Sequence, residues 1–318
     1  MKKGASALVT AAAVCAALAL VACSAEAMEG ARRSLTLCAQ VLIPSLFPFF
    51  VISALLQELG LPSRLGRLAA PLMARLFGVS GSGCAALILG LMAGYPLGAA
   101  SVAGLVQRGE LSKAEGERLL GFCNNSGPAF MLGAAGAGVF GSLKAGLILY
   151  LSHIAAALLS GVLLSAGHRR RSYSLPEPAP IAPGAVPAAV LASVRNMLNV
   201  CGFVLAFGVA VAVLDAVGFL PTLTLRLSEL TGLELSAARA LMVGFFELGG
   251  GVGAMRGLAA TPLNLAVCAA VIGWGGLSVH FQTAAVAGDM KTARHFAGRC
   301  LSAVFSFLLV LLLAPLAL

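Results

Sequence analysis

FCNNSGPAF, at residues 122–130, places two amides, a hydroxyl, a glycine and a proline in direct succession inside a strongly apolar chain. Non-helical backbone at membrane depth is tolerated only where it is buried in protein or lines a water-filled cavity. Asn124, Asn125 and Ser126 are helix-capping residue types. Pro128 suits the first turn of a new helix, where no amide donor is needed. The stretch predicts a break in a membrane helix, which we interpret as the tip of a re-entrant hairpin; a plain turn between two packed spans is the alternative.

The composition predicts an all-α polytopic membrane protein whose surroundings are the lipid bilayer. Of 318 residues, 59% are hydrophobic and 10% charged, and the mean hydropathy is +0.98, whereas a soluble domain has about 25% charged residues. The net charge of +9 is carried by basic residues scattered through short loops. These are topology signals, so no nucleic-acid partner is expected.

The sequence carries no pattern that is typical of an enzyme or a metal site. None of the eight cysteines forms a CxxC pair, so neither a disulfide framework nor a zinc site is indicated. Gly136, Gly138 and Gly141 satisfy GxGxxG, but no strand precedes them and no acid follows at the required distance. P-loop, HExxH and GxSxG motifs are missing from the sequence. We therefore expect a protein that is not an enzyme and needs no cofactor or metal.

Apolar segments of spanning length recur along the chain. We expect about seven transmembrane helices, at 5–24, 35–57, 84–107, 144–166, 188–216, 237–257 and 296–317. Two further stretches, 119–141 and 262–286, are interrupted by polar residues, and we expect them to be re-entrant hairpins. The charged segment 108–119 reads as a short helix outside the bilayer, with capping-box spacing at Ser112 and Glu115.

The first segment allows two interpretations. A basic start, an apolar stretch and LVAC ending at Cys23 resemble a lipoprotein signal peptide. The stretch is long and further spans follow, so we expect an attached first helix and no lipid on Cys23.

The chain divides into two similar halves. We expect a first helix and connector (1–34), a first gate-like repeat (35–166), a cytoplasmic linker (167–187) that includes HRRR at 168–171, and a second gate-like repeat (188–318). If the two interrupted stretches dip in and return, the halves have inverted topology, as in secondary transporters. The positive-inside bias is moderate, because this scheme leaves Arg108, Lys113 and Arg118 outside.

Each half also contains glycines spaced by four. These are Gly90, Gly94 and Gly98 in the first half, and Gly249, Gly253 and Gly257 in the second. Such spacing places glycines on one helical face and permits close backbone approach.

Four segments resemble a known family in their order. IPSLFPFFV (43–51), GLMAGYPLGA (90–99), LSKAEGERLL (111–120) and CNNSGPAF (123–130) are similar to the YlbJ-like sporulation integral membrane proteins. That family lies within the gate-domain, or nucleoside-recognition-domain, membrane proteins, which are distantly related to concentrative nucleoside transporters. The resemblance implies a role in endospore formation, moving dipicolinic acid across the membrane around the forespore. It implies no settled binding residues.

Candidate binding residues come from the physical reading alone. Glu247 is the only acid in the apolar run 237–257, where a carboxylate is costly and usually functional. It suits a proton carrier or a substrate contact; pairing with another helix is the alternative. The remaining candidates cluster at the expected breaks, and they are Tyr95, Asn124, Asn125, Ser126, Gly127, Ser278, His280 and Gln282.

These features together predict a membrane transporter for a small polar, anionic metabolite. Two half-helix N-termini and side-chain amides would supply donors to a carboxylate, and such a site would need no buried arginine. A nucleoside or related metabolite transporter and a non-transporting scaffold for spore maturation are the alternatives. A coupling ion, H⁺ or Na⁺, and a homo-oligomer stay open.

Overall fold

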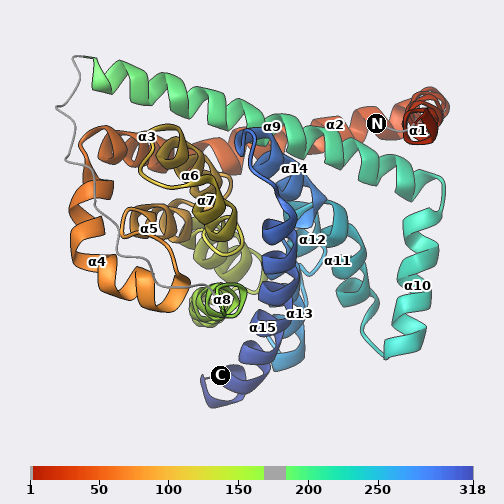
Figure 1. Cartoon of the computed structure of the whole chain (residues 1–318). Helices are drawn as coiled ribbons and strands as arrows, with labels where there is room; N and C mark the ends of the chain where they lie inside the picture. The colour runs from red at the N-terminus through yellow and green to blue at the C-terminus, as the bar shows by residue number, and fades with distance from the viewer. Residues whose placement is uncertain (1–2, 168–183, 318) are drawn as a thin grey trace.

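The computed structural model describes residues 3–167 and 184–317, and these are helical with no strand among them. HRRR at 168–171 and most of the linker lie outside the described residues. Figure 1 shows the arrangement. The elements are α1 (Lys3–Ala22), α2 (Ser24–Leu37), η1 (Cys38–Leu42), α3 (Ile43–Glu58), α4 (Leu61–Phe77), α5 (Gly83–Ala93), α6 (Leu97–Gln107), α7 (Lys113–Leu119), η2 (Ala129–Val139), α8 (Leu143–Leu164), α9 (Ala185–Ala216), α10 (Phe219–Thr231), α11 (Leu235–Phe246), α12 (Leu248–Gly253), α13 (Pro262–Trp274), α14 (Gly276–Val286) and α15 (Ala293–Ala317).

Five helical runs in the described residues are long and apolar enough to cross a membrane. They are Ser24–Glu58, Leu143–Leu164, Ala185–Ala216, Pro262–Val286 and Ala293–Leu316. The first run joins α2, η1 and α3, so the connector expected before residue 35 is helical. It packs against α9, where Gly30 lies against Ala212 and Gly208 against Ser34. These small residues let the two backbones approach closely.

The segment 84–107 is a hairpin, and its prediction as a membrane span is wrong. The short helices α5 and α6 fold back and pack against each other on either side of a break at Gly94–Pro96. Each has 11 residues, about 16 Å of helix, which is half of a ~30 Å hydrocarbon core. Gly90 and Gly98 face each other across the hairpin, so these glycines meet through the fold rather than on one helical face.

The segment 237–257 contains a second hairpin, and its prediction as a span is also wrong. The helices α11 and α12 pack against each other on either side of Glu247. Here the close backbone contact is between Gly244 and Gly251. The predicted ridge of Gly249, Gly253 and Gly257 is incorrect, because a Cβ added at Gly253 or Gly257 would meet nothing within 4 Å.

The segment 119–141 does not turn back, so the predicted re-entrant hairpin there is wrong. It follows α8 along its whole length in the opposite direction. Gly121 lies beside Leu164 at one end of α8, and Gly136 lies against Gly146 at the other. Midway, the Ser126 amide donates to His153 Nε2 at 3.3 Å. The segment is therefore a broken helix, with an extended stretch at 124–127 before η2.

The segment 262–286 follows α15 in the same way, and the hairpin predicted there is wrong. Gly273 lies against Ala303, and the rings of His280 and His295 are 5.0 Å apart. The helices α13 and α14 thus continue one another around a break at Gly275, which has φ +86°. The sequence thus identified the helix-breaking residues, but it assigned the segments the wrong way round. The two expected spans contain hairpins, and the two expected hairpins are broken helices.

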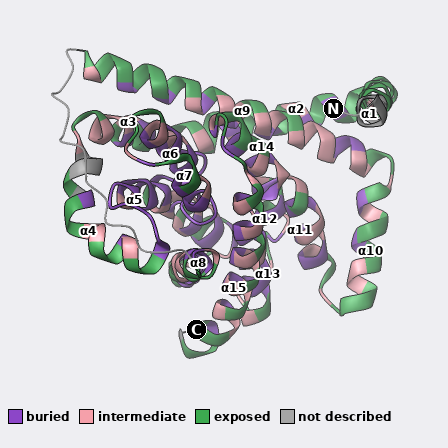
Figure 2. Cartoon of the chain, in the orientation of Figure 1, coloured by how far each residue is buried: buried purple, intermediate pink, exposed green. Residues whose placement is uncertain are grey.

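Each half places one amphipathic helix ahead of its hairpin. α4 is bounded by Gly60 and Gly78, and α10 by Gly218 and Gly232; all four glycines have positive φ, which glycine adopts without the strain of a side chain. Figure 2 shows buried residues gathered at the α5–α6 hairpin and exposed residues along α4, α9 and α10. Between the first hairpin and its broken helix lies α7, whose Ser112–Glu115 capping box is confirmed.

Candidate functional site

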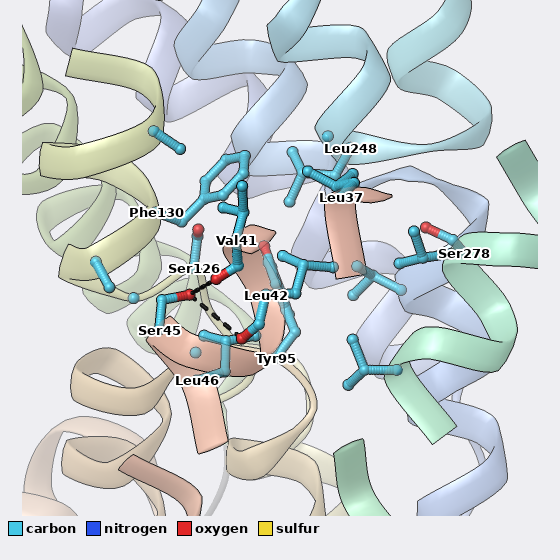
Figure 3. A pocket seen from close by; sticks show the side chains of 18 of the residues that line it. Leu37, Val41, Leu42, Ser45, Leu46, Tyr95, Ser126, Phe130, Leu248 and Ser278 are labelled. Atoms are coloured by element: carbon cyan, nitrogen blue, oxygen red, sulfur yellow. Dashed lines mark hydrogen bonds between the residues drawn. The ribbon is translucent and has the colours of Figure 1, made fainter. Parts of the chain in front are cut away.

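A cavity of about 520 Å³ lies where the two hairpins and the two broken helices meet. Its walls come from both halves of the chain, with η1, the start of α3 and part of α9 closing one side. Most of the lining is apolar (Figure 3), and Phe130 and Leu248 contribute large side chains. The polar lining residues are Gln40, Ser45, Tyr95, Ser126, Glu247, Ser278 and Gln282.

The tip of the first hairpin meets both broken helices. A Cβ added at Gly94, where φ is +88°, would lie 3.0 Å from the amide nitrogen of Gly127. Gly275 packs against the Tyr95 hydroxyl in the same way. Both glycines have positive φ, which a residue with a side chain rarely adopts, and both contacts leave little room for one.

The tip of the second hairpin contacts the break between α13 and α14. Gly276 packs against the backbone of Phe246 and Leu248, on either side of Glu247. The Glu247 carboxylate accepts hydrogen bonds from the amides of Gly249 at 2.8 Å and Gly250 at 2.5 Å. It caps its own helix and lines the cavity, so the costly intramembrane carboxylate is satisfied by backbone N–H groups.

The start of α14 offers an unused donor to the cavity. Its N-terminus has no side-chain cap, so its first N–H groups have no partner from a capping side chain. The Ser278 hydroxyl is buried, lines the cavity and has no hydrogen-bond partner in the described part of the chain. A buried unpaired hydroxyl is costly, and a bound ligand would satisfy it.

A fully buried arginine stands behind the cavity, and the sequence interpretation missed it. Arg299, on α15, donates to the Tyr95 hydroxyl at 2.7 Å, to Asn125 Oδ1 at 3.2 Å and to Ser302 Oγ at 2.7 Å. Within the described residues, no carboxylate lies at ion-pair distance from it, and its Nε has no partner. The signal was present, because Arg299 is a charge inside the apolar run 296–317. The sequence interpretation held that an anion site would need no buried arginine, and the structure places one beside Tyr95, next to the cavity lining.

Six of the nine predicted residues line the cavity, and they are Tyr95, Ser126, Gly127, Glu247, Ser278 and Gln282. The other three do not. The amide of Asn124 accepts from Ala99 N and donates to Thr283 Oγ1, while that of Asn125 donates to Phe122 O. His280 lies among the rings of Trp274, His295 and Phe296.

The two asparagines therefore use their amides to connect segments of the protein. No group of three or more histidines, cysteines or acids in the described ranges is placed to hold a metal ion.

Comparison with known proteins points to a membrane protein family. Residues 39–169 match the Gate family, described as nucleoside recognition. The chain is also 29% identical to the sporulation integral membrane protein YlbJ of Bacillus subtilis strain 168, across 90% of this chain and 77% of that protein. No solved structure matches. These findings confirm the resemblance seen in the sequence, and the protein is an integral membrane protein.

The Gate match covers nearly all of the cavity lining that comes from the first half of the chain. It includes the first hairpin and the first broken helix, and so Tyr95 and Ser126. Glu247, Ser278 and Arg299 lie beyond it. The second wall of the cavity thus rests on the geometry of the fold rather than on the family match.

Proposed function

We propose that the protein is a membrane transporter that carries a small polar, anionic metabolite. The observation that supports this most directly is the meeting of two hairpin tips and two helix breaks around one cavity. Secondary transporters hold their substrates near the bilayer midplane between discontinuous helices of two repeats. The arms of the first hairpin have 11 residues each, and their length of about 16 Å reaches that depth.

An inverted relation between the halves is compatible with the exchanged roles of hairpins and broken helices. In the first half a hairpin that returns is followed by a broken helix that crosses, so later spans keep the orientation that the sequence predicted. This arrangement assigns the segment 108–119, with Arg108, Lys113 and Arg118, to the inner face instead of the outer face. This strengthens the positive-inside bias.

We infer a negatively charged substrate from hydrogen-bond donors and a positive charge near the cavity that have no anionic partner among the described residues. The Ser278 hydroxyl and the uncapped start of α14 face the cavity, and a helix N-terminus favours anions. Arg299 adds a buried positive charge directly behind Tyr95. A buried charge without a counter-ion is unfavourable, and an anionic substrate would relieve that cost.

Glu247 opposes an anion, and this opposition suggests how transport is coupled. Two negative charges in one low-dielectric cavity repel each other. An anion can therefore enter favourably when Glu247 is protonated or when a cation enters with it. We propose that H⁺ or Na⁺ accompanies the substrate, with Glu247 as the coupling group. Glu247→Gln should then abolish the response of transport to the driving ion gradient while leaving substrate exchange.

A nucleoside is the second candidate substrate. The Gate family carries the description nucleoside recognition, and Phe130 provides an aromatic wall while Gln282 provides a hydrogen-bonding amide. A neutral nucleoside needs no coupling cation to offset Glu247. The two candidates thus differ in whether Arg299 and an ion gradient matter.

Exchange in proteoliposomes tests both candidates. Proteoliposomes that contain the purified full chain would be loaded with unlabelled dipicolinate, the substrate implied by the resemblance, or with unlabelled uridine. Uptake of the same compound in labelled form would then be followed. Ser278→Ala should weaken affinity for an anion roughly 10- to 150-fold, since a hydrogen bond to a charged group contributes ~1.5–3 kcal/mol. Ser193→Ala is the matched control, because its buried hydroxyl bonds within α9 to Ala189 O and lies away from the cavity.

Each outcome has a definite meaning. Saturable uptake of dipicolinate that falls with Ser278→Ala supports the anion proposal. Uptake of uridine alone, unaffected by ion gradients, supports the nucleoside. Absence of exchange for both compounds, with a folded protein that still binds partner proteins, supports a scaffold instead.

A further inference from the structure

The helix α4 presents a basic and apolar face that is not covered by protein. Its buried face carries Met73 and Phe77, and Gly66 packs against the backbone at Gly81 and Ser82. The opposite face carries exposed residues from Arg64 to Leu76. Leu68 is 82% exposed and Leu72 57% exposed.

Helical periodicity sorts the exposed residues of α4 into two adjacent strips. At 100° per residue, Arg64, Arg67 and Arg75 fall within about 80° of one another. Leu68, Leu72 and Leu76 form the next strip. An interfacial helix combines such a basic strip with an apolar strip, because it lies in the plane of the headgroups.

The three arginines of α4 have no acidic partner. The segment Leu61–Phe77 contains no Asp or Glu. Among the described residues, no ion pair involves Arg64, Arg67 or Arg75. Three exposed guanidinium groups thus have no anionic partner among the residues that the structure describes.

The counterpart helix α10 lacks this charge. It has the same position ahead of its hairpin and exposes Leu225 and Leu230. Its one arginine, Arg226, pairs with Glu229 at 3.3 Å. The apolar strip is shared between the two helices, whereas the unpaired positive charge belongs to α4 alone.

The two helices lie at opposite ends of α9 (Figure 1). The helix α10 follows the C-terminus of α9, and the run α2–α3 packs antiparallel to α9, with Gly30 beside Ala212. The end of α3, and hence α4, therefore lies near the N-terminus of α9. Because α9 is long enough to cross the bilayer, α4 and α10 belong to opposite leaflets.

We propose that α4 is a binding site for anionic phospholipids in one leaflet, with Arg64, Arg67 and Arg75 on the phosphate groups and Leu68 and Leu72 in the acyl boundary. The chemistry of the strip favours this partner, since guanidinium groups bind phosphate and a neighbouring apolar strip suits acyl chains. The site does not depend on what the cavity carries.

Fluorescence quenching by brominated lipids tests this site in the full chain. The protein has one tryptophan, Trp274, so Trp274→Phe with Leu72→Trp creates a single reporter on α4. Vesicles would mix phosphatidylcholine and phosphatidylglycerol, with bromine on one lipid at a time. Brominated phosphatidylglycerol should quench more strongly than its bulk fraction predicts. The matched control is Leu225→Trp on α10, where the two lipids should quench in proportion to their amounts.

Charge variants identify the cause of the preference. Changing all three arginines to Gln should remove the preference at position 72. Each arginine lost should weaken the affinity for the anionic lipid about fivefold. Changing all three to Lys should keep most of it. Quenching by brominated phosphatidylcholine verifies that each variant is inserted.

Four results would overturn the proposal. These are an equal preference at position 225, a preference that survives the Gln variant, loss of the preference on adding inorganic phosphate, and a reporter shielded from both lipids. The third result would indicate a site for free phosphate, and the last would indicate that a second copy covers α4.

Discussion

The guanidinium of Arg299 donates to the Tyr95 hydroxyl at 2.7 Å, and that hydroxyl in turn donates to Ile272 O at 3.1 Å. This chain of two bonds joins α15, the tip of the first hairpin and the end of α13. It connects the two halves of the protein beside the cavity. Because the only proton of the hydroxyl is used, Tyr95 offers its ring to the cavity and cannot donate a hydrogen bond to a substrate.

Tyr95→Phe should therefore act mainly on stability. The change leaves a carbonyl and one arm of a buried guanidinium without a partner, which costs about 1–3 kcal/mol. Thermal unfolding of the purified protein in detergent would measure the loss.

Tyr150→Phe is the matched control for that change. Its hydroxyl donates to Leu91 O at 3.3 Å from a half-buried position, so a smaller loss is expected. An equal loss in the two variants would contradict a special role for the Arg299–Tyr95 bond.

The contact between the first hairpin and the extended stretch allows no side chain. A Cβ at Gly90 or Gly98 would overlap the carbonyl oxygen of Cys123. Gly90→Ala should displace the hairpin tip and sharply reduce the amount of folded protein, since close-packed backbone cannot yield locally. Gly253→Ala is the control, because nothing lies within 4 Å of its added Cβ. Size-exclusion profiles of both variants would decide, and a well-folded Gly90→Ala variant would show that the hairpin tolerates movement.

How far the sequence predicts this fold depends on whether a feature is local. The break at 124–127 and the capping box at Ser112 depend on neighbouring residues, and both were predicted correctly. Whether an interrupted apolar segment turns back or crosses depends on distant contacts, such as Gly121 beside Leu164. Those contacts leave no local pattern. The position of Gly94 in the middle of 84–107 was a usable clue, because each arm is too short to cross alone.

The site was predicted in part for the same reason. Glu247 and Ser278 stand at breaks, and a break in a membrane helix either lines a cavity or is buried in protein. Arg299 lies in an uninterrupted helix, so attention to breaks alone missed it. Asn124 and Asn125 also stand at a break, but their amides bond to other segments of the protein. No sequence pattern separates a polar group that faces a cavity from one that bonds a neighbouring segment.

Asn125 and Ser126 should differ although they are adjacent. Asn125 is fully buried and its amide bonds Phe122 O and Arg299, so Asn125→Ala should lower thermal stability by about 1–3 kcal/mol. The Ser126 side chain lines the cavity, so Ser126→Ala should instead weaken substrate uptake with little change in stability. Thermal unfolding and uptake would be measured on the same purified variants. The reverse assignment of losses would contradict the cavity as the binding site.

The crossing of 119–141 makes a prediction about membrane sidedness. Single cysteines would replace Arg64, Lys113, Lys144 and Arg226, which are exposed, after the exposed Cys15 and Cys300 are changed to Ser. Two hydrogen bonds connect α7 to the C-terminal end of α4: Arg118 donates to Gly78 O, and the Ser80 amide donates to the Glu115 carboxylate. Positions 64 and 113 should therefore label from the same face. Because 119–141 runs the length of α8, position 144 should label from the other face. If the halves are inverted, position 226 should label together with position 144.

A membrane-impermeant maleimide applied to intact and permeabilised cells would measure this. Labelling of positions 113 and 144 from one face would restore the re-entrant hairpin, and labelling of positions 64 and 226 from one face would exclude the inverted arrangement.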